Sequence, residues 1–382
     1  MAAKILFHLN QVGYGGTEKA ILSFCQNLNR DKFEPYLFIY NKKPKYKYYW
    51  YLFLSKLSKK YKNRFFTKYI HSRARLSDFV QTIGQKNIFE GNAKEFEKII
   101  NTVSPDIVHF NRGKWELFFD DLINQVPGSR VCIETNIFGY PASEHYFKRL
   151  KKAYFVSHWL LQKSSWSGSK GAVLYNPIKK PANSESIRKT LKIPEDAFVF
   201  GRISRPDLMD DDFILEVFSK IKNENAYLLV LAGSRIMRDA AENNDRIILI
   251  DATTSESTIS NFYNSIDLLL HYRIDGETFG MNIAEAMIHG KPVISHLSQI
   301  DNAQAELLES TAHHGVVGYI CPQNNMTAYL NHMLELMNNP EKLAELGNNA
   351  RHRASDLFQE DIVTRYLENE YTKLLSESYA GV

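Results

Sequence analysis

Short apolar runs alternate with amphipathic stretches along most of this chain. In the first half the apolar runs lie at 4–9, 36–40, 106–110, 130–135 and 153–157, and helical periodicity is present at 17–28 and 93–103. The pattern restarts in the second half, with apolar runs at 198–203, 226–233, 247–252, 267–272, 292–297 and 317–322. Strands that alternate with helices are typical of a parallel sheet covered by helices. We therefore predict an α/β protein with two Rossmann-like halves.

The segment 176–198 separates the two patterns and is rich in Pro, Ser, Asn and Lys, as linkers are. A chain of 382 residues also exceeds what one hydrophobic core usually organises. We place the N-terminal domain at 1–177 and the C-terminal domain at 178–355. A last helical stretch, 356–382, closes the chain.

The cysteines and the apolar runs bear on where the protein is found. Cys25, Cys132 and Cys321 lie far apart within apolar runs and form neither a metal-ligand spacing nor a disulfide framework. This usage predicts a reducing, cytoplasmic setting. The first residues lack the pattern of a signal peptide, and no stretch approaches about 18 uncharged apolar residues. Neither a signal peptide nor a transmembrane helix is expected.

Two glutamates flank a glycine-containing turn in the segment GETFGMNIAEAMIHGKPVIS, residues 276–295. The glycines predict that Glu277 lies in a loop, that a helix begins near Met281 and that Glu285 lies about one turn inside it. The first N–H groups of a helix have no partner within it and attract anions. Carboxylates accept hydrogen bonds from hydroxyls. The arrangement suits a phosphorylated, polyhydroxylated ligand such as a nucleotide-sugar.

The same segment resembles the E-x7-E signature of retaining GT-B glycosyltransferases, in particular the large family-four group. Six earlier segments are also similar to that family and occur in the same order as in its members. They are 10–21, 104–111, 154–163, 173–178, 200–207 and 230–234. The resemblance implies the GT-B fold, in which two Rossmann-like domains face a central cleft, with 356–382 packing back on the first domain. It also implies transfer of a sugar with retention of configuration, through front-face attack.

The resemblance and the chemistry of the side chains together give a set of expected site residues. The expected catalytic residues are Arg202, Glu277, His109 and Asn136. The expected donor-binding residues are Gly15, Gly16, Arg202, Arg205, Glu277, Phe279, Gly280, Met281, Asn282 and Glu285. The donor would be a UDP- or GDP-sugar, and no cofactor is expected.

Arg202 and Arg205 follow the first strand of the second half, where fixed cations would stabilise a leaving diphosphate. Relatives usually pair such an arginine with a lysine, but this chain has Met209 and Asp210 at the aligned positions. Arg205 is the candidate replacement. The alternative for either arginine is a salt bridge at a domain interface.

The acidic run 210–212 allows two interpretations. A D-x-D sequence binds divalent cations in another glycosyltransferase fold, whereas acidic residues also stabilise a helix N-terminus. A site with arginines on the diphosphate needs no metal, so the second interpretation is favoured and no metal is expected.

Several other residues keep open alternatives. The loop around Gly15 and Gly16 either approaches the donor diphosphate or the acceptor, or forms a tight turn. His109 is either a cleft residue or a buried, hydrogen-bonded strand residue, and Asn136 is a candidate contact for sugar or acceptor. Polar residues after the strand at 292–297, Gln304 among them, either contact ligand or make hydrogen bonds within the loop.

A basic, aromatic insert at 42–75 has no acidic residue and holds twelve Lys or Arg and ten aromatic side chains. Aromatics and cations together are typical of segments that bind an anionic membrane surface. A helical insert with buried aromatics is the alternative, and no nucleic-acid motif accompanies the charge. Membrane contact would make the protein peripheral to the cytoplasmic face and the acceptor a lipid or lipid-linked glycan.

The leading functional prediction is a retaining, metal-independent glycosyltransferase that acts on a lipid-linked glycan, a glycolipid or a surface polysaccharide. A sugar-nucleotide epimerase or hydrolase of the same fold is the first alternative. A non-catalytic protein that binds nucleotide-sugars is the second.

Overall fold

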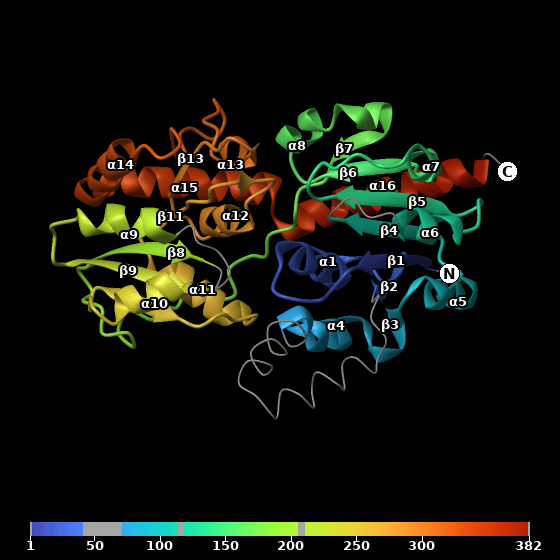
Figure 1. Ribbon diagram of the computed structural model, residues 1–382, viewed down its shortest axis with the longest axis horizontal. Coiled ribbons are helices and arrows are strands. Elements are labelled where there is room, and N and C mark those ends of the chain that lie inside the picture. Colours follow the sequence, from blue (N-terminus) through green and yellow to red (C-terminus); the bar gives the residue numbers. More distant parts are fainter. Residues whose placement is uncertain (1, 41–70, 114–117, 205–210, 381–382) are drawn as a thin grey trace. The chain divides into compact units, whose positions relative to one another are not determined.

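The computed structural model describes residues 2–40, 71–113, 118–204 and 211–380 (Figure 1). The chain divides into two compact units, each described here by itself. Unit 1 is Met1–Pro177 with Glu360–Val382, and unit 2 is Ile178–Gln359. We expected the boundary at 355/356, but this position falls within the last turn of helix α15 (Pro340–Leu357), and the two units divide after Gln359. The backbone of Ile178 bonds to Phe358 at 2.7 Å, which keeps the end of this helix in unit 2.

Unit 1 is built on a sheet in which every pair of adjacent described strands is parallel. The strands, in the spatial order β3-β2-β1-β4-β5-β6-β7, are β3 (Ile88–Gly91), β2 (Phe33–Tyr40), β1 (Ala3–Leu9), β4 (Ile107–Arg112), β5 (Val131–Asn136), β6 (Lys152–Phe155) and β7 (Gly171–Val173). The helices are α1 (Gly16–Asn27), α4 (Leu76–Ile83), α5 (Ala93–Val103), α6 (Phe118–Asn124), α7 (Glu144–Arg149), α8 (His158–Lys163) and α16 (Glu360–Ala380). This is the parallel, helix-flanked sheet that the sequence predicts.

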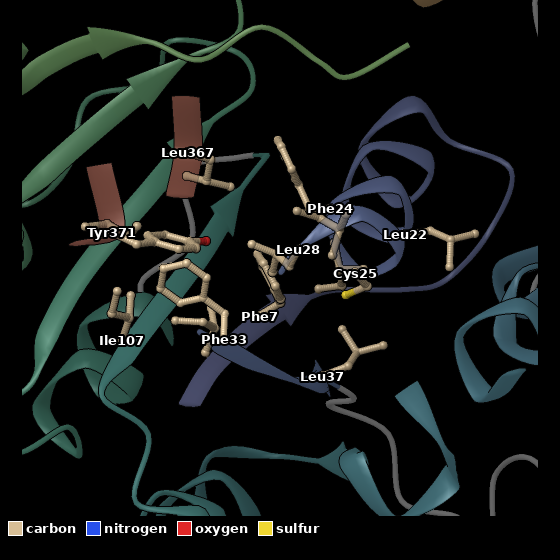
Figure 2. Close-up of a cluster of buried hydrophobic side chains, with 14 of the residues drawn as sticks. Phe7, Leu22, Phe24, Cys25, Leu28, Phe33, Leu37, Ile107, Leu367 and Tyr371 are labelled. Carbon is tan, nitrogen blue, oxygen red and sulfur yellow. The ribbon is translucent and has the colours of Figure 1, made fainter. Parts of the chain in front are cut away.

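Helix α16 packs onto unit 1 through one apolar face. Its buried side chains recur every three or four residues, at Val363, Leu367, Tyr371 and Leu374, which is the spacing of one helix face. Figure 2 shows Leu367 and Tyr371 beside Phe7 of β1, within the main core of this unit. The C-terminal helix therefore completes the core of the unit that contains the N-terminus.

Unit 2 repeats the architecture with a second parallel sheet. Its strands, in the spatial order β10-β9-β8-β11-β13-β15, are β10 (Ile247–Ile250), β9 (Ala226–Leu231), β8 (Phe198–Ile203), β11 (Leu268–Leu270), β13 (Val293–His296) and β15 (Gly318–Cys321). The helices besides α15 are α9 (Asp211–Ser219), α10 (Arg235–Ala241), α11 (Glu256–Ser265), α12 (Met281–Ile288), α13 (Ala303–Leu307) and α14 (Met326–Asn338). The spatial order is that of a Rossmann sheet, with the first and fourth strands side by side.

Two very short strands lie outside the main sheet of unit 2. They are β12 (Gly276–Glu277) and β14 (Asp301–Asn302), which pair in parallel. Neither was predicted from the sequence, nor were β3 and β7, because none of these four segments contains a run of more than two apolar residues. Among the described helices, none is long and apolar enough to cross a membrane.

Candidate functional site

The strand order of unit 2 reverses between β8 and β11, and ligands of open α/β sheets bind at such a switch point. Arg202, the penultimate residue of β8, is almost completely buried there. Its Nη1 donates a hydrogen bond of 2.9 Å to the main-chain oxygen of Tyr272, just beyond β11. One guanidinium thus joins the carboxyl ends of the two strands that flank the switch point.

Asp211 holds the same guanidinium from the other side. Arg202 Nε donates to Asp211 Oδ1 at 3.1 Å, and Ser204 Oγ donates to Asp211 Oδ2 at 2.7 Å. Asp211 is fully buried and lies with Asp212 in the first turn of α9. The interpretation of these two acidic residues as a helix N-terminus is confirmed. The ion pair with Arg202 lies within unit 2 and was not predicted from the sequence.

Glu277 lies between two basic side chains. Its Oε1 is 3.4 Å from His271 Nε2 and 3.4 Å from Arg273 Nη1. Burial alone would raise the pKa of Glu277, but the contacts with His271 and Arg273 outweigh it and lower the pKa. Burial also lowers the pKa of His271, against the opposing effect of Glu277. The site therefore holds an ionised carboxylate beside a neutral imidazole.

The tautomer of His271 follows from its two contacts. Nδ1 lies 2.7 Å from Ser295 Oγ, and Nε2 faces the ionised Glu277. A carboxylate only accepts, so Nε2 carries the proton and Nδ1 accepts from the hydroxyl.

The backbone of Glu277 is fixed by the small β12–β14 pair. Gly276 has φ +71°, and a Cβ there would come within 1.7 Å of the main-chain oxygen of Asp301. Glu277 N donates to Gln304 Oε1 at 3.0 Å, while Gln304 Nε2 donates to His296 O at 2.9 Å. Gln304 is fully buried, so of the two alternatives for this residue the structure shows the loop contact.

Helix α12 begins at Met281, as predicted, and is preceded by Gly280 in the left-handed region at φ +102°. The first intrahelical bond runs from Ala284 N to Gly280 O at 3.1 Å. The side chain of Asn282 accepts from Ile283 N at 3.0 Å. In the part of the chain that the structure describes, the N–H groups of Met281 and Asn282 therefore remain available at the helix N-terminus.

Phe279, expected to bind donor, packs its side chain into the interior. It is 2% exposed, and its ring meets Phe358 edge-on with centroids 5.5 Å apart. The side chain thus has a packing role in unit 2, and the donor contact expected of this residue stays a prediction.

Glu285 lies one turn inside α12 and is half-buried. Tyr263 of α11 donates through its hydroxyl to Glu285 Oε2 at 3.0 Å and to the main-chain oxygen of Asn282 at 3.1 Å. Burial, followed by the nearby Glu285, raises the pKa of Tyr263 well above its usual value. The neutral hydroxyl orients the carboxylate relative to the start of the helix.

His109, expected to be catalytic, is a structural residue of unit 1. It is fully buried, with Nδ1 2.7 Å from the hydroxyl of Tyr371 and Nε2 2.8 Å from Thr135 Oγ1. Burial lowers its pKa to about 3. Both ring nitrogens are used to join β4, β5 and α16, so the buried-strand alternative holds for this residue.

Asn136, also expected to be catalytic, holds the turn after β5. Its Nδ2 donates to Tyr140 O at 2.8 Å, and its Oδ1 accepts from Gly139 N at 2.9 Å. The side chain is fully buried. The expectation of a ligand contact is corrected to a turn-forming role.

Gly15 and Gly16 lie at the start of α1, with Gly15 as the N-terminal cap residue. A Cβ on Gly15 would come within 2.2 Å of the carboxylate of Glu18. A side chain at position 15 would therefore require the carboxylate of Glu18 to move. Arg205 and most of the basic insert (42–70) lie outside the described residues.

A small hollow in unit 1 opens beside these glycines and the carboxyl ends of β4 and β5. Its lining includes Thr17, Asn111, Thr135, Tyr175 and Asn176. Asn111 Oδ1 is buried and has no hydrogen-bond partner among the described residues, while Nδ2 donates to His8 O at 3.0 Å.

Three residues of the site in unit 2 make contacts that were not predicted from the sequence. A basic residue after a strand, such as Arg273, carries no distinctive spacing. Tyr263 and Asp211 act through Glu285 and Arg202, which lie on other elements. Only the pairing of neighbouring strands and helices reveals such contacts.

Comparison with known proteins bears first on the second half of the chain. Residues 183–353 match the family model described as glycosyl transferases group 1. This segment is therefore similar to the glycosyl transferases of group 1. It contains every residue of the site built above around Arg202, Glu277 and Glu285.

Similar proteins extend the comparison beyond residues 183–353. The capsular polysaccharide biosynthesis glycosyltransferase CapM of Staphylococcus aureus is 25% identical over 206 residues, and the match spans 51% of this chain and 51% of CapM. The chain thus matches about half the length of this curated relative.

Two solved structures share the fold over nearly the whole chain. A glycosyltransferase from Rickettsia africae has a TM-score of 0.71 at 18% identity, covering 98% of this chain and 99% of that one. Anabaena HepE in complex with UDP-glucose has a TM-score of 0.67 at 16% identity, covering 97% and 99%. The expected fold class, GT-B with two Rossmann-like halves, is confirmed.

Proposed function

We propose that this protein is a retaining, metal-independent glycosyltransferase that moves a sugar from a nucleotide-sugar to a glycan acceptor. The observation that carries the proposal is Arg202, a buried guanidinium that joins β8 and β11 at the switch point of unit 2. Such a cation is preorganised because Asp211 and Tyr272 fix its orientation before any ligand arrives.

The nucleotide part of the donor is assigned to α12. Glu285 accepts hydrogen bonds from the ribose hydroxyls, oriented by Tyr263, and the N–H groups of Met281 and Asn282 face the diphosphate. The structure of Anabaena HepE with UDP-glucose makes a UDP-sugar the first donor to test.

The transferred sugar is assigned to Glu277, and its neighbour Arg273 is assigned to the diphosphate. The ionised carboxylate of Glu277 accepts from sugar hydroxyls, while Arg273, which is half-buried, turns toward the diphosphate oxygens. Donor binding would then exchange the Arg273–Glu277 contact for contacts to the ligand.

In the reaction the bond between the anomeric carbon and the diphosphate oxygen breaks. The acceptor hydroxyl oxygen forms the new bond on the same face, and its proton passes to the leaving diphosphate. The negative charge on the diphosphate grows in the transition state, where Arg202 and the start of α12 stabilise it. The protein supplies position and charge, with no covalent intermediate.

The acceptor is assigned to unit 1. The similarity to CapM supports a proposal for the class of acceptor. CapM is a capsular polysaccharide biosynthesis protein, so a lipid-linked glycan or polysaccharide precursor is proposed here. The aromatic side chains of Tyr14, Phe138 and Tyr140 are each more than 40% exposed at loops after β1 and β5. Exposed rings suit the apolar faces of sugars, and the basic insert suits an anionic membrane surface.

Product analysis with purified protein tests the proposal. UDP-, GDP- and ADP-sugars are first ranked by thermal shift, since a bound donor stabilises by mass action. The preferred donor is then incubated with and without a lipid-linked glycan, in the presence of EDTA. A product that keeps the donor's anomeric configuration and forms only with acceptor supports retaining transfer.

Other outcomes of this experiment decide against the proposal. Conversion of the donor without acceptor would favour the epimerase or hydrolase. Donor binding with no turnover under any condition would favour a non-catalytic binding protein. Strict dependence on a divalent cation would overturn the metal-free mechanism.

A further inference from the structure

Three side chains of unit 2 meet at the surface where the turn 311–315 lies against helix α15. They are His313 on the turn and His352 and Asp356 on the helix. One ligand atom from each lies within 4.8 Å of the other two. His352 and Asp356 are four residues apart on one helix face, the spacing at which two side chains can hold the same ion.

The distances to one carboxylate oxygen fit a tetrahedral ion better than direct hydrogen bonds. Asp356 Oδ2 lies 3.4 Å from His313 Nε2 and 3.6 Å from His352 Nε2. Both distances exceed those of ordinary N–H···O hydrogen bonds, roughly 2.7–3.2 Å. Ligands of tetrahedral Zn²⁺ at bond lengths of roughly 2.0–2.2 Å lie about 3.3–3.6 Å apart, which is the edge of the tetrahedron.

The carboxylate is oriented by a fourth, buried side chain. His314 Nε2 lies 3.1 Å from Asp356 Oδ2, and its Nδ1 faces the hydroxyl of Thr311 at 3.2 Å and Arg353 Nη1 at 3.5 Å. Because Arg353 only donates, Nδ1 accepts and Nε2 carries the proton. His314 thus positions Asp356, as outer partners of metal-ligating carboxylates do.

The turn is closed by its own main-chain hydrogen bonds. Thr311 and Gly315 exchange backbone hydrogen bonds, with Gly315 N 2.7 Å from Thr311 O. Arg353 of α15 donates to the main-chain oxygens of Leu307 at 3.1 Å and Glu306 at 2.9 Å, in helix α13 just before the turn. Together with the contacts of His314 to Asp356 and Arg353, these bonds join the segment that carries His313 to the helix that carries His352.

We propose that His313, His352 and Asp356 form a zinc site that fastens the turn 311–315 to the end of α15. Two imidazoles and one carboxylate suit Zn²⁺, and the exposed position leaves the fourth place to water. The site lies apart from Arg202, Glu277 and Glu285 in the sequence and shares no residue with them. Its role is to stabilise unit 2, independently of sugar transfer.

Calorimetric titration of the metal-free, full-length protein with ZnCl2 tests the proposal. The wild type should bind one Zn²⁺ per chain in a saturable step, and Zn²⁺ should raise its Tm. H313A and H352A should each weaken binding at least tenfold, and the double variant should abolish both signals. H332A, which removes a histidine of α14 paired with Glu335, is the matched control and should bind as the wild type does.

Two further readouts keep the test decisive. The ligand side chains are at least 43% exposed, so all variants should keep the metal-free Tm of the wild type, which shows that they fold. Their affinity for a UDP-sugar should also be unchanged, which separates this site from the proposed function. Absence of saturable Zn²⁺ binding, or equal affinity in the wild type and the double variant, would overturn the proposal.

Discussion

Arg202 and Asp211 form an ion pair in the interior of unit 2, with Nε 3.1 Å from Oδ1 and side-chain exposures of 3% and 0%. Asp211 also accepts from Ser204 at the end of β8. The positive charge of Arg202, which we propose stabilises the leaving diphosphate, is therefore held in position by contacts within the protein.

Replacing Asp211 by Asn should lower the free energy of unfolding. The change leaves Arg202 charged and buried without its counter-ion, and breaking a buried pair from one side costs about 3–5 kcal/mol. Denaturant titration measures the loss. Asp212→Asn, at the exposed neighbour in the same helical turn, is the control and should change the midpoint little. An unchanged midpoint for Asp211→Asn would show that the pair does not stabilise the fold.

Replacing Arg202 by Lys should lower turnover more than donor affinity. Lysine keeps the positive charge beside Asp211 but lacks the several N–H groups of the guanidinium, which can bond to Tyr272 and to a phosphate oxygen at the same time. Because the lost contact strengthens in the transition state, we expect kcat to fall at least tenfold with little change in the Kd of the donor. A variant whose defect lies only in donor affinity would contradict the assignment of Arg202 to the leaving group.

Replacing Glu285 by Ala should weaken donor binding at least tenfold. A charged hydrogen bond is worth roughly 1.5–3 kcal/mol, and the carboxylate is assigned two ribose hydroxyls. Calorimetry with the nucleotide alone gives the affinity, and circular dichroism checks the fold. Tyr263→Phe keeps the carboxylate but removes its 3.0 Å partner, so it should cause a smaller loss. If Glu285→Ala binds nucleotide as the wild type does, the ribose is held elsewhere.

Replacing His8 by Phe should make the protein more resistant to acid. The imidazole lies among the rings of Phe38, Phe110 and Phe119, and burial lowers its pKa from 6.5 to about 3. Below pH 6.5 the unfolded chain therefore binds a proton that the folded chain does not, so stability falls with pH down to about 3.

The measurement for His8→Phe is the change in unfolding free energy between pH 7.5 and pH 5. At about 1.4 kcal/mol per pH unit, the wild type should lose about 2 kcal/mol more than the variant over this interval. Any packing penalty of the larger ring is the same at both pH values and cancels in the comparison. Equal losses in the two proteins would mean that His8 takes up its proton in the folded state.

The basic insert should bind the protein to anionic vesicles in a salt-dependent way. Each Lys or Arg near such a surface contributes about 1 kcal/mol, and salt screens the attraction beyond about 8 Å at physiological ionic strength. The fraction of protein that sediments with the vesicles should fall steeply as salt rises, and the binding that remains at high salt should come from aromatic side chains around Trp50. Exchanging Lys56, Lys59, Lys60 and Lys62 for Glu should reduce the bound fraction at low salt.

The matched control for the insert carries four exposed lysines of unit 2 exchanged for Glu. They are Lys189, Lys192, Lys220 and Lys222. This variant has the same net charge as the insert variant and should still bind. A wild type that ignores anionic vesicles at low salt would remove the main support for a lipid-linked acceptor.

The sequence predicts the fold well because most strands of the main sheets, other than β3 and β7, lie in apolar runs. It also places the start of α12 at Met281, since Gly280 must adopt a left-handed conformation there. It fails for His109 and Asn136. Polar residues at the carboxyl ends of strands look alike in sequence, whether they face a ligand or, as here, bond to a turn or to α16. Contacts such as Tyr263 to Glu285 join residues on different elements and leave no local pattern.

The clamp formed by Gly276, Asp301 and Gln304 limits how the donor preference of this protein can be redesigned. The main chain of Glu277 is bonded to Gln304 and paired with Asn302, so the carboxylate moves whenever the 298–304 loop moves. A library that randomises this loop would therefore alter catalysis and specificity together. Varying side chains on α11 instead, around Tyr263, changes the surroundings of Glu285 while the position of Glu277 stays fixed.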